Sequence, residues 1–518
     1  MIALNASRPL CGGAKTPADG MSRTAMSTVL GWAVGMLLLS LGSGFAATPL
    51  QAPIERSGFA RLTPHDSLEA FLVSLSKRSG ITLRHVARSV QGRSVDGLLF
   101  ADTSASAPGE LRVLLFAQQH GDEPSGNEAL TMLAARLAGA SSAHLLDGLE
   151  ILLVPQMNPD GAELRQRRTA EGVDQNRVHL LLSTPEVRGL HDLFLEWMPH
   201  VTVDVHEYSA LSKSWLAEGI VRAADVQLGL LTNLNVPGSL RSYQADVVLP
   251  AIAERMKQSG YLFHEYIVGS PQTRIRHSTT EINDGRQSFG VFNTLSFIQE
   301  GRQDETLEQH LERRVRSQLT ALEALLELCA ERAAEIRSLV EGERARSKIG
   351  AAFVTVMEHE PGRDSLRIPV IGADGSEVQS WVVAPYHGEV RPLARERLPA
   401  AYLIPDSLHA LVEVLEAHGA EASWCGGQAT WKAGLYQLDS VWTAELEEEP
   451  HRCVSYQVID TSLSTGHGYW RLGLDQPAAL LIATFLEPGS MWGLSRYEQF
   501  ADLYRHPIFP VLRIEKRP

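Results

Sequence analysis

At 518 residues the chain is too long for one ordinary domain, and a typical domain size of about 150 residues predicts two or three domains. Hydrophobic residues make up 44% of the chain and charged residues 21%, which is normal for a globular protein and argues against disorder. The net charge of −14 argues against nucleic acid or an anionic membrane surface as a partner.

The first 46 residues have the pattern of a secretory signal peptide. A short apolar run, Val29–Leu41, follows Arg23, and the small residues Gly44 and Ala46 come next. The run is too short for an easy membrane span. We therefore predict cleavage and an exported protein, periplasmic or secreted, with no stable membrane insertion after cleavage. An uncleaved membrane anchor is the alternative.

The segment that follows has the alternating pattern of an α/β domain. Leu68, Phe71 and Leu75 lie on one face of a predicted helix after Pro64, and residues 91–94 read as a hairpin turn. Apolar runs then alternate with helical patterns, which predicts a mostly parallel, mixed central sheet flanked by helices. The predicted buried strands of this sheet are 111–119, 149–157, 200–205 and 291–299.

The chain changes character near residue 350. Helical spacing from 303 to 342 predicts one long helix or two shorter ones. Beyond it, short strand-like runs and one helical segment, 407–419, predict a second, smaller α+β or β-rich C-terminal domain. The resulting domain prediction is a signal peptide over 1–46, a catalytic domain over 47–348 and an accessory domain over 349–518.

Four cysteines are too few for a disulfide-based scaffold. Cys11 lies in the predicted leader. Cys329 sits among leucines in a helical pattern, which predicts a buried thiol. Cys425 and Cys453 are close enough in sequence to pair in an oxidising compartment, and the sequence leaves open whether they do.

Polar residues that bind metals follow four of the predicted strands. Because buried parallel strands place their ligands at their carboxyl ends, we expect these four patches to meet at one edge of the sheet. Two histidines and one carboxylate would leave a zinc coordination position open, which is typical of a catalytic site. The patches are His120–Glu123, Asn158–Gly161 with Gly172–Arg177, Asp204–Tyr208 and Phe297–Arg302.

Each of these patches also has an ordinary structural interpretation when taken alone. The spacing of His120 and Glu123 occurs by chance in many proteins, and a single His206 is more often a buried, hydrogen-bonded histidine. Glu300 alone is also consistent with an ion pair to Arg302. The order of the patches favours the metal site, because every one of them follows an apolar strand and all suit one chemistry.

The chemistry of the patches suggests a role for each residue. Glu300 is the candidate general base that takes a proton from the attacking water and then returns it to the leaving group. Arg167, Asn176 and Arg177 cluster after the second strand, where guanidinium groups can hold a substrate carboxylate or stabilise an oxyanion.

The motifs over residues 60–340 resemble those of the zinc metallocarboxypeptidases of the carboxypeptidase A type, a His₂Glu zinc family. HGDEPSGNEAL, DVHEY, GVDQNR and SFIQEGR are each similar to a family motif, and GRSVDG fits the family's entry segment. The segment 401–419, with Asp475–Pro477 and Leu486–Pro488, resembles a C-terminal module of a bacterial subgroup.

The resemblance implies one zinc ion per chain, held by His120, Glu123 and His206. It implies Glu300 as the catalytic glutamate and Arg167 as the arginine that polarises the scissile carbonyl. It implies that Asn176 and Arg177 bind the terminal carboxylate of a peptide. We also expect Tyr208 and Arg286 to contact the substrate, which completes the set of site residues predicted from the sequence.

The chain departs from the family pattern around the substrate. Asp122 stands where the family commonly has arginine, and Val178–His179 replace the usual asparagine and aromatic residue. The family's mobile tyrosine has no match, since that stretch reads Arg276–Ser278. In the expected specificity pocket, Arg286 would favour an acidic terminal side chain and Asp284 a basic one. The alternative is that both are solvated loop charges.

The function predicted from the sequence is therefore that of an exported zinc metallocarboxypeptidase acting on peptides with a free C-terminal carboxylate. One alternative is another amide hydrolase on the same scaffold, such as one that trims murein peptides. A second is a catalytically silent peptide- or glycan-binding protein. A third is a membrane-anchored scaffold, which depends on retention of the leader.

Overall fold

A computed structural model of the chain describes residues 50–101, 110–139, 144–146, 148–362, 365–426, 430–464 and 468–515. Residues 50–518 belong to one compact unit. The predicted signal peptide lies outside the described residues, and the predicted boundary at residue 348 stays a prediction. Within the described ranges, no helix combines the length and the apolarity that crossing a bilayer requires.

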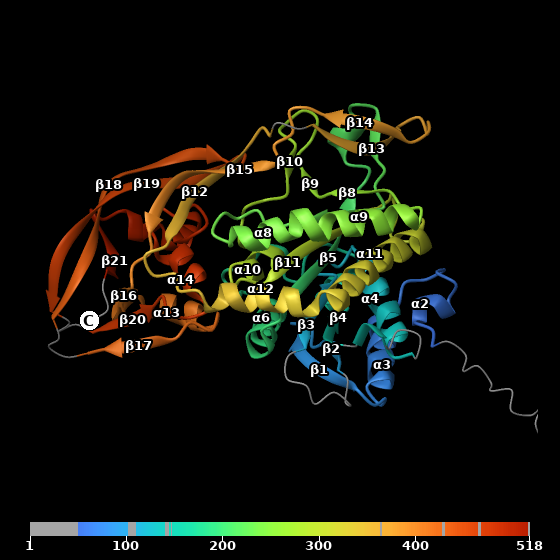
Figure 1. The fold of residues 1–518 in the computed structure, drawn as a ribbon, viewed down its shortest axis with the longest axis horizontal. Helices are drawn as coiled ribbons and strands as arrows, with labels where there is room; N and C mark the ends of the chain where they lie inside the picture. The colour runs from blue at the N-terminus through green and yellow to red at the C-terminus, as the bar shows by residue number, and fades with distance from the viewer. Residues whose placement is uncertain are drawn as a thin grey trace, which may run out of the picture. The chain divides into compact units, whose positions relative to one another are not determined.

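A mixed eight-stranded sheet forms the centre of the fold (Figure 1). The β3–β4, β3–β5, β5–β11 and β7–β8 pairs are parallel, whereas the β1–β2, β2–β4 and β7–β11 pairs are antiparallel. In spatial order the strands are β1 (Ile81–Arg88), β2 (Ser94–Phe100), β4 (Leu149–Val154), β3 (Leu111–Ala117), β5 (Val201–Ser209), β11 (Leu295–Gln303), β7 (Val226–Gly229) and β8 (Phe263–Glu265).

Helices cover both faces of this sheet. Gly126 in α4 packs against the side chain of Val205, and Gly285 in α10 packs against Asp204, the preceding residue of β5. Because successive side chains of a strand point to opposite faces, α4 and α10 lie on opposite sides of the sheet. Such two-sided cover explains why the central strands β3 and β5 are buried along nearly their whole length rather than at alternate residues.

The helices of this region have the following bounds: α2 (Pro53–Arg56), α3 (His65–Leu75), α4 (Pro124–Leu137), α5 (Pro159–Leu164), α6 (Pro185–Trp197), α7 (Lys213–Leu216), α8 (Gly238–Tyr243), α9 (Leu249–Gln258), α10 (Gly285–Gly290), α11 (Leu311–Glu331) and α12 (Ala333–Ala345). A 3-10 turn, η2 (Gln175–Arg177), follows α5, and a π-helical turn, η3 (Gln244–Val248), joins α8 to α9. Helix α11 packs against both α4 and α9.

Several local predictions are confirmed. The predicted first helix is α3, the predicted hairpin is β1–β2, and the helical stretch after residue 303 is divided into α11 and α12. Cys329 is a buried thiol on α11. Cys425 and Cys453 are both free thiols, so the structure contains no disulfide between them.

The C-terminal region is rich in strands, as predicted. A six-stranded antiparallel sheet has the order β17–β20–β16–β21–β18–β19. The β12–β15 pair and the β13–β14 hairpin are the other strands of this region, and they lie in separate sheets. The strands are β12 (Ala352–Glu360), β13 (Leu366–Gly372), β14 (Gln379–Val383), β15 (Glu389–Arg397), β16 (Ala401–Pro405), β17 (Ala422–Cys425), β18 (Thr430–Leu446), β19 (Glu449–Ser464), β20 (Tyr469–Gly473) and β21 (Ile508–Ile514). The helical elements are η4 (Asp406–Leu408), α13 (His409–Glu416), α14 (Ala479–Leu486), η5 (Leu494–Arg496) and η6 (Glu498–Tyr504).

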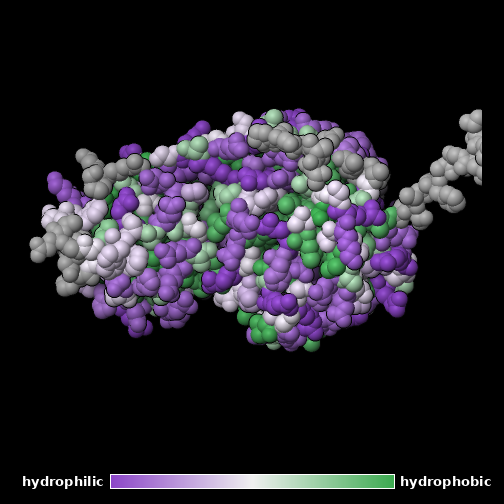
Figure 2. All heavy atoms as spheres, turned by 90° about the horizontal axis from the view of Figure 1, so that it is seen from below, coloured by the Kyte–Doolittle hydropathy of each residue, from purple (hydrophilic) through white to green (hydrophobic). Residues whose placement is uncertain are grey.

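The C-terminal strands also pair with the first part of the chain. The hairpin β13–β14 extends a short strand, β6 (Ile220–Arg222), to give a three-stranded sheet. Two further short strands, β9 (Ile267–Val268) and β10 (Arg276–His277), pair with each other nearby. The face drawn in Figure 2 is mostly hydrophilic, with smaller hydrophobic areas between the polar residues.

Candidate active site

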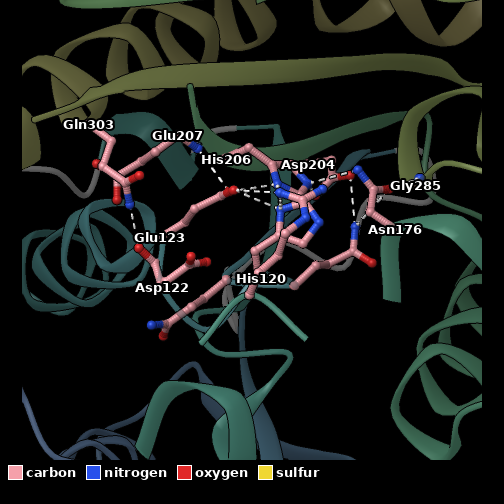
Figure 3. A network of polar contacts seen from close by, with 12 residues as sticks. His120, Asp122, Glu123, Asn176, Asp204, His206, Glu207, Gly285 and Gln303 are labelled. Atoms are coloured by element: carbon pink, nitrogen blue, oxygen red, sulfur yellow. Dashed lines mark hydrogen bonds and ion pairs between the residues drawn. The ribbon is translucent and has the colours of Figure 1, made fainter. Parts of the chain in front are cut away.

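Three buried side chains converge at the carboxyl edge of the central sheet. The metal-binding atoms of His120, Glu123 and His206 all lie within 4.8 Å of one another. Nδ1 of His120 is 2.8 Å from Glu123 Oε1, and Nδ1 of His206 is 2.9 Å from Glu123 Oε2. Figure 3 shows the Glu123 carboxylate reaching toward the two imidazole rings, with Asn176 and Gly285 on their far side.

The turn after β3 brings His120 and Glu123 to the same point. The strand ends at Ala117, and Glu123 occupies the position immediately before the first residue of α4, Pro124. Gly121 is required in this turn because a Cβ there would lie only 2.1 Å from the carbonyl carbon of Gly161. His206 arrives from β5, whose register with β3 and β11 is fixed by parallel pairing.

A second layer of carboxylates holds the two histidine rings. Asp174 Oδ1 accepts a hydrogen bond from His120 Nε2 at 3.1 Å, and Asp204 Oδ1 lies 2.8 Å from His206 Nε2. With the proton of each ring on Nε2, both Nδ1 atoms carry a lone pair directed at the same space. A carboxylate on the outer nitrogen of a metal-binding histidine fixes its tautomer and orientation.

The donor set fits a zinc ion. The Nδ1 atoms of His120 and His206 are only 3.1 Å apart, so their lone pairs repel unless a proton or a cation lies between them. Glu123 adds a negative charge at the same point. Burial by itself would raise the pKa of Glu123, but the adjacent His120 and His206 lower it below its usual range. Two imidazoles and one carboxylate are a ligand set of catalytic zinc sites.

Glu300 lies beside this centre on β11. In the parallel pairing of β11 with β5, Glu300 is the partner of His206. Its side chain is 6% exposed, and burial raises its pKa to about 7, with His206 opposing this shift and Glu123 adding to it. A carboxyl group with a pKa near neutrality suits proton transfer in both directions. Arg302, considered as a partner of Glu300, pairs instead with Asp304 at 2.9 Å.

The three polar residues predicted after the second strand lie in the same cleft. Arg167 is 41% exposed at its side chain and reaches Glu123 Oε1 at 3.2 Å and Asp174 Oδ2 at 3.1 Å. Asn176 is buried, and its Oδ1 accepts a hydrogen bond from the Gly285 backbone at 2.8 Å.

Arg177 donates a hydrogen bond to the carbonyl oxygen of Asn176 at 2.7 Å, and no carboxylate of the described residues lies within ion-pair distance of it. Its guanidinium is therefore available to an anionic ligand. The cleft that these side chains line has a volume of about 310 Å³.

The specificity-pocket residues are buried, so the solvated-loop alternative is wrong. Arg286 is 1% exposed, and its guanidinium pairs with Asp284 Oδ2 at 2.9 Å. Each charge of this pair satisfies the other, and both line the cleft. Tyr208 also lines the cleft, but its hydroxyl donates to the Ala224 carbonyl, so its ring rather than its hydroxyl faces a ligand.

Sequence reasoning missed a chain of hydrogen bonds behind Asp204. Gln119 Nε2 donates to Asp204 Oδ2 at 2.8 Å, and Gln119 Oε1 accepts from His179 Nε2 at 2.8 Å. His179 Nδ1 then accepts from His191 Nε2 at 3.0 Å. Burial lowers the pKa of His179 to about 3, so this ring is neutral. In the sequence, the one feature that could have indicated this role of Gln119 is its position immediately before His120.

Sequence reasoning also missed Arg222 and Tyr266, which line the same cleft. Arg222 ends the three-residue strand β6, which is too short to show a periodic pattern. Tyr266 lies between β8 and β9, and its backbone N–H donates to the Leu228 carbonyl at 2.9 Å.

Comparison with known proteins agrees with this geometry. Residues 68–212 match the Peptidase_M14 family, described as zinc carboxypeptidase. Carboxypeptidase 2 of Trichophyton rubrum is 26% identical over 475 residues, which cover 88% of this chain and 87% of that protein. Carboxypeptidase M of Mus musculus is 36% identical over 114 residues, 20% of this chain and 25% of that protein. A solved metallo-carboxypeptidase from Pseudomonas aeruginosa aligns with a TM-score of 0.42 at 20% identity, over 52% of this chain and 69% of that one.

The chain is therefore an enzyme of the zinc metallopeptidase class. Its residues 68–212 match the model of the zinc carboxypeptidase family, in agreement with the resemblance of its motifs. The predicted zinc cofactor is confirmed by the match to a zinc carboxypeptidase family and by the group of His120, Glu123 and His206, which is compatible with one Zn²⁺ per chain.

If Asp204 orients His206 as the geometry indicates, replacing Asp204 by asparagine will weaken zinc binding. We expect Asp204→Asn to raise the Kd for zinc about 10- to 100-fold, the usual effect of removing a partner of a metal-binding histidine. Titration against a competing chelator measures this change. Asp246→Asn, at an exposed position, is the matched control. An unchanged Kd in Asp204→Asn would contradict the assignment.

Proposed function

We propose that this enzyme removes residues from the C-terminus of peptides, with His120, Glu123 and His206 as zinc ligands and Glu300 as general base. The observation that carries the proposal is the pairing of Glu300 with His206 on adjacent parallel strands. It puts a carboxyl group with a pKa of about 7 beside the metal ligands, in a cleft that also contains Arg177.

Each residue has a distinct task in the proposed mechanism. Zinc, when bound, would acidify a water molecule and polarise the scissile carbonyl group. The Glu300 carboxylate takes a proton from the attacking water and passes it to the leaving amine. Arg167, exposed enough to turn from Glu123 toward the substrate, donates hydrogen bonds to the oxyanion. Asp174 and Asp204 keep the two imidazoles in one tautomer throughout.

Recognition of the free C-terminal carboxylate would fall to Arg177. Arg177 lines the cleft, and no carboxylate of the described residues pairs with it. It directly follows Asn176, whose side-chain amide lies 3.3 Å from His206 Nε2. A guanidinium group can bind a carboxylate through two parallel hydrogen bonds. Asn176 would support this arrangement by holding the turn against Gly285.

We further propose that the enzyme is exported, on the basis of the apolar segment Val29–Leu41 and the small residues that follow it. The intact mass of the protein recovered outside the cytoplasm of the producing cell tests this. A mass lower by about that of residues 1–46 is expected, whereas a full-length mass would favour the anchor.

Replacing Glu300 by glutamine should abolish turnover while zinc stays bound. The amide keeps the shape of the side chain but cannot accept a proton, so kcat should fall by about 10²-fold or more. Peptide hydrolysis and elemental zinc analysis of the same preparation measure the two effects. Glu254→Gln, at an exposed position on α9, is the control. Wild-type activity in Glu300→Gln would refute the proposed mechanism.

Replacing Arg177 by glutamine should raise KM more than it lowers kcat, because the charge would act on binding in both the ground state and the transition state. We expect about a 10- to 100-fold rise for peptides with a free C-terminus, the cost of one charge-assisted interaction. The wild type should leave the same peptides intact when their C-termini are amidated. Efficient hydrolysis of the amides would argue for an endopeptidase instead.

A further inference from the structure

The cleft arginines differ in whether they already have an anionic partner. Four arginines line the cleft. Arg167 and Arg286 lie within ion-pair distance of carboxylates, as described above. No carboxylate of the described residues lies within that distance of Arg177 or Arg222. Arg177 is exposed, whereas Arg222 is buried. A buried guanidinium without a partner is costly, so Arg222 indicates that a ligand brings a negative charge to this part of the cleft.

Arg222 is held by aromatic rings and one carbonyl group rather than by a carboxylate. Its side chain is 8% exposed, and its terminal nitrogen donates to the Ser209 carbonyl at 2.7 Å. The guanidinium carbon lies 4.4 Å from the centre of the Tyr208 ring and 5.5 Å from that of Trp215. Its Nε atom is buried, and no described atom accepts its hydrogen bond. Burial lowers the pKa of Arg222, which a bound anion would offset.

The position of Arg222 is fixed by the C-terminal region of the chain. Arg222 is paired with Val370 across the antiparallel contact of β6 with β13. Behind this contact, Trp215 packs with Ile368 and Trp381 in a small hydrophobic cluster. Figure 1 shows the hairpin β13–β14 apart from the large C-terminal sheet and beside β8 and β9. A rigid wall of this kind suits a specificity-determining residue, because the guanidinium is held in place before a ligand arrives.

We propose that Arg222 is a second anion-binding residue of the cleft, which makes the enzyme selective for peptides with an acidic side chain in one of their last two residues. This inference rests on the proposed function, because it assigns the terminal carboxylate of the peptide to Arg177. The acidic side chain would accept a hydrogen bond from the guanidinium group of Arg222. Arg286 does not compete for it, since Asp284 already neutralises that charge.

The test compares glutamate with glutamine, which differ in charge but hardly in shape. N-acylated dipeptides carry Glu or Gln at the last or the penultimate position, and kcat/KM is measured for each. We expect the wild type to prefer Glu over Gln about 10- to 100-fold at one of the two positions, the range of a charge-assisted hydrogen bond. In Arg222→Met, which keeps the length and the apolar packing of the side chain, the ratio should fall toward one. Arg222→Lys should retain part of it.

Controls separate this role from a purely structural one. Arg316→Met, on α11 outside the cleft, should keep the wild-type ratio. Zinc content and the thermal midpoint of each variant report folding, and Arg222→Gln replaces Arg222→Met if the latter does not fold. A wild-type ratio near one, or a ratio unchanged in the folded Arg222 variants, would overturn the proposal.

A binding measurement keeps this inference distinct from the proposed function. In Glu300→Gln, calorimetry should show that the Glu peptide binds more tightly than the Gln peptide, and that adding Arg222→Met removes the difference. If the wild type hydrolyses no peptide but this difference is present, the proposed function fails and the anion site stands. If peptides are hydrolysed and the difference is absent, only the anion site fails.

Discussion

The buried carboxylate of Glu123 is the point at which the separate parts of the catalytic region meet. It contacts His120 and His206, lies within ion-pair distance of Arg167, and accepts a hydrogen bond from the backbone of Glu207. Removing a carboxylate from water costs several kcal/mol unless it is paired. The end of β3, the strand β5 and the segment after α5 therefore have to come together here, and this requirement places the whole site at the carboxyl edge of the sheet.

The surroundings of this centre leave few side chains free to move. Glu207, next to His206, is buried, and its Oε1 accepts hydrogen bonds from two nitrogens of Arg314 of α11, at 2.6 and 2.9 Å. Its Oε2 accepts a hydrogen bond from the backbone of Ser125 in α4. On the other side of the sheet, Gly285 allows α10 to approach Asp204, because a Cβ would lie 2.5 Å from its carboxylate oxygen. Each imidazole is thus supported from behind before a metal arrives, which is how metal sites keep their geometry.

The C-terminal region packs on the loop that forms one wall of the cleft. Glu447, at the turn between β18 and β19, lies 3.4 Å from Arg276, and the indole nitrogen of Trp492 donates to Thr280 at 3.2 Å. Arg496 pairs with Glu281 at 3.2 Å. These contacts, together with the β6–β13 pairing, give this region a role in shaping the substrate cleft. The C-terminal region is therefore packed against the part of the chain that forms the cleft.

The sequence by itself determined the elements and the metal chemistry of this protein. Apolar runs followed by polar patches are local patterns, and parallel strands carry such patches to one edge without further information. That is why the convergence of His120, Glu123 and His206 was predictable. The family resemblance added the roles of the surrounding residues, which the geometry accommodates.

Only the tertiary structure decided which charged side chains have an oppositely charged partner. The pairing of Arg286 with Asp284 depends on burial that no spacing shows, and the hydrogen-bond chain behind Asp204 joins it to Gln119, 85 positions away. Arg222 owes its place to a strand contributed by residues 366–372, so nothing near it in the sequence marks it as part of the cleft. Whether a charged side chain has a partner depends on distances across the fold, which the sequence does not give directly. The periodicity of apolar residues depends on neighbours in the chain, which the sequence does give.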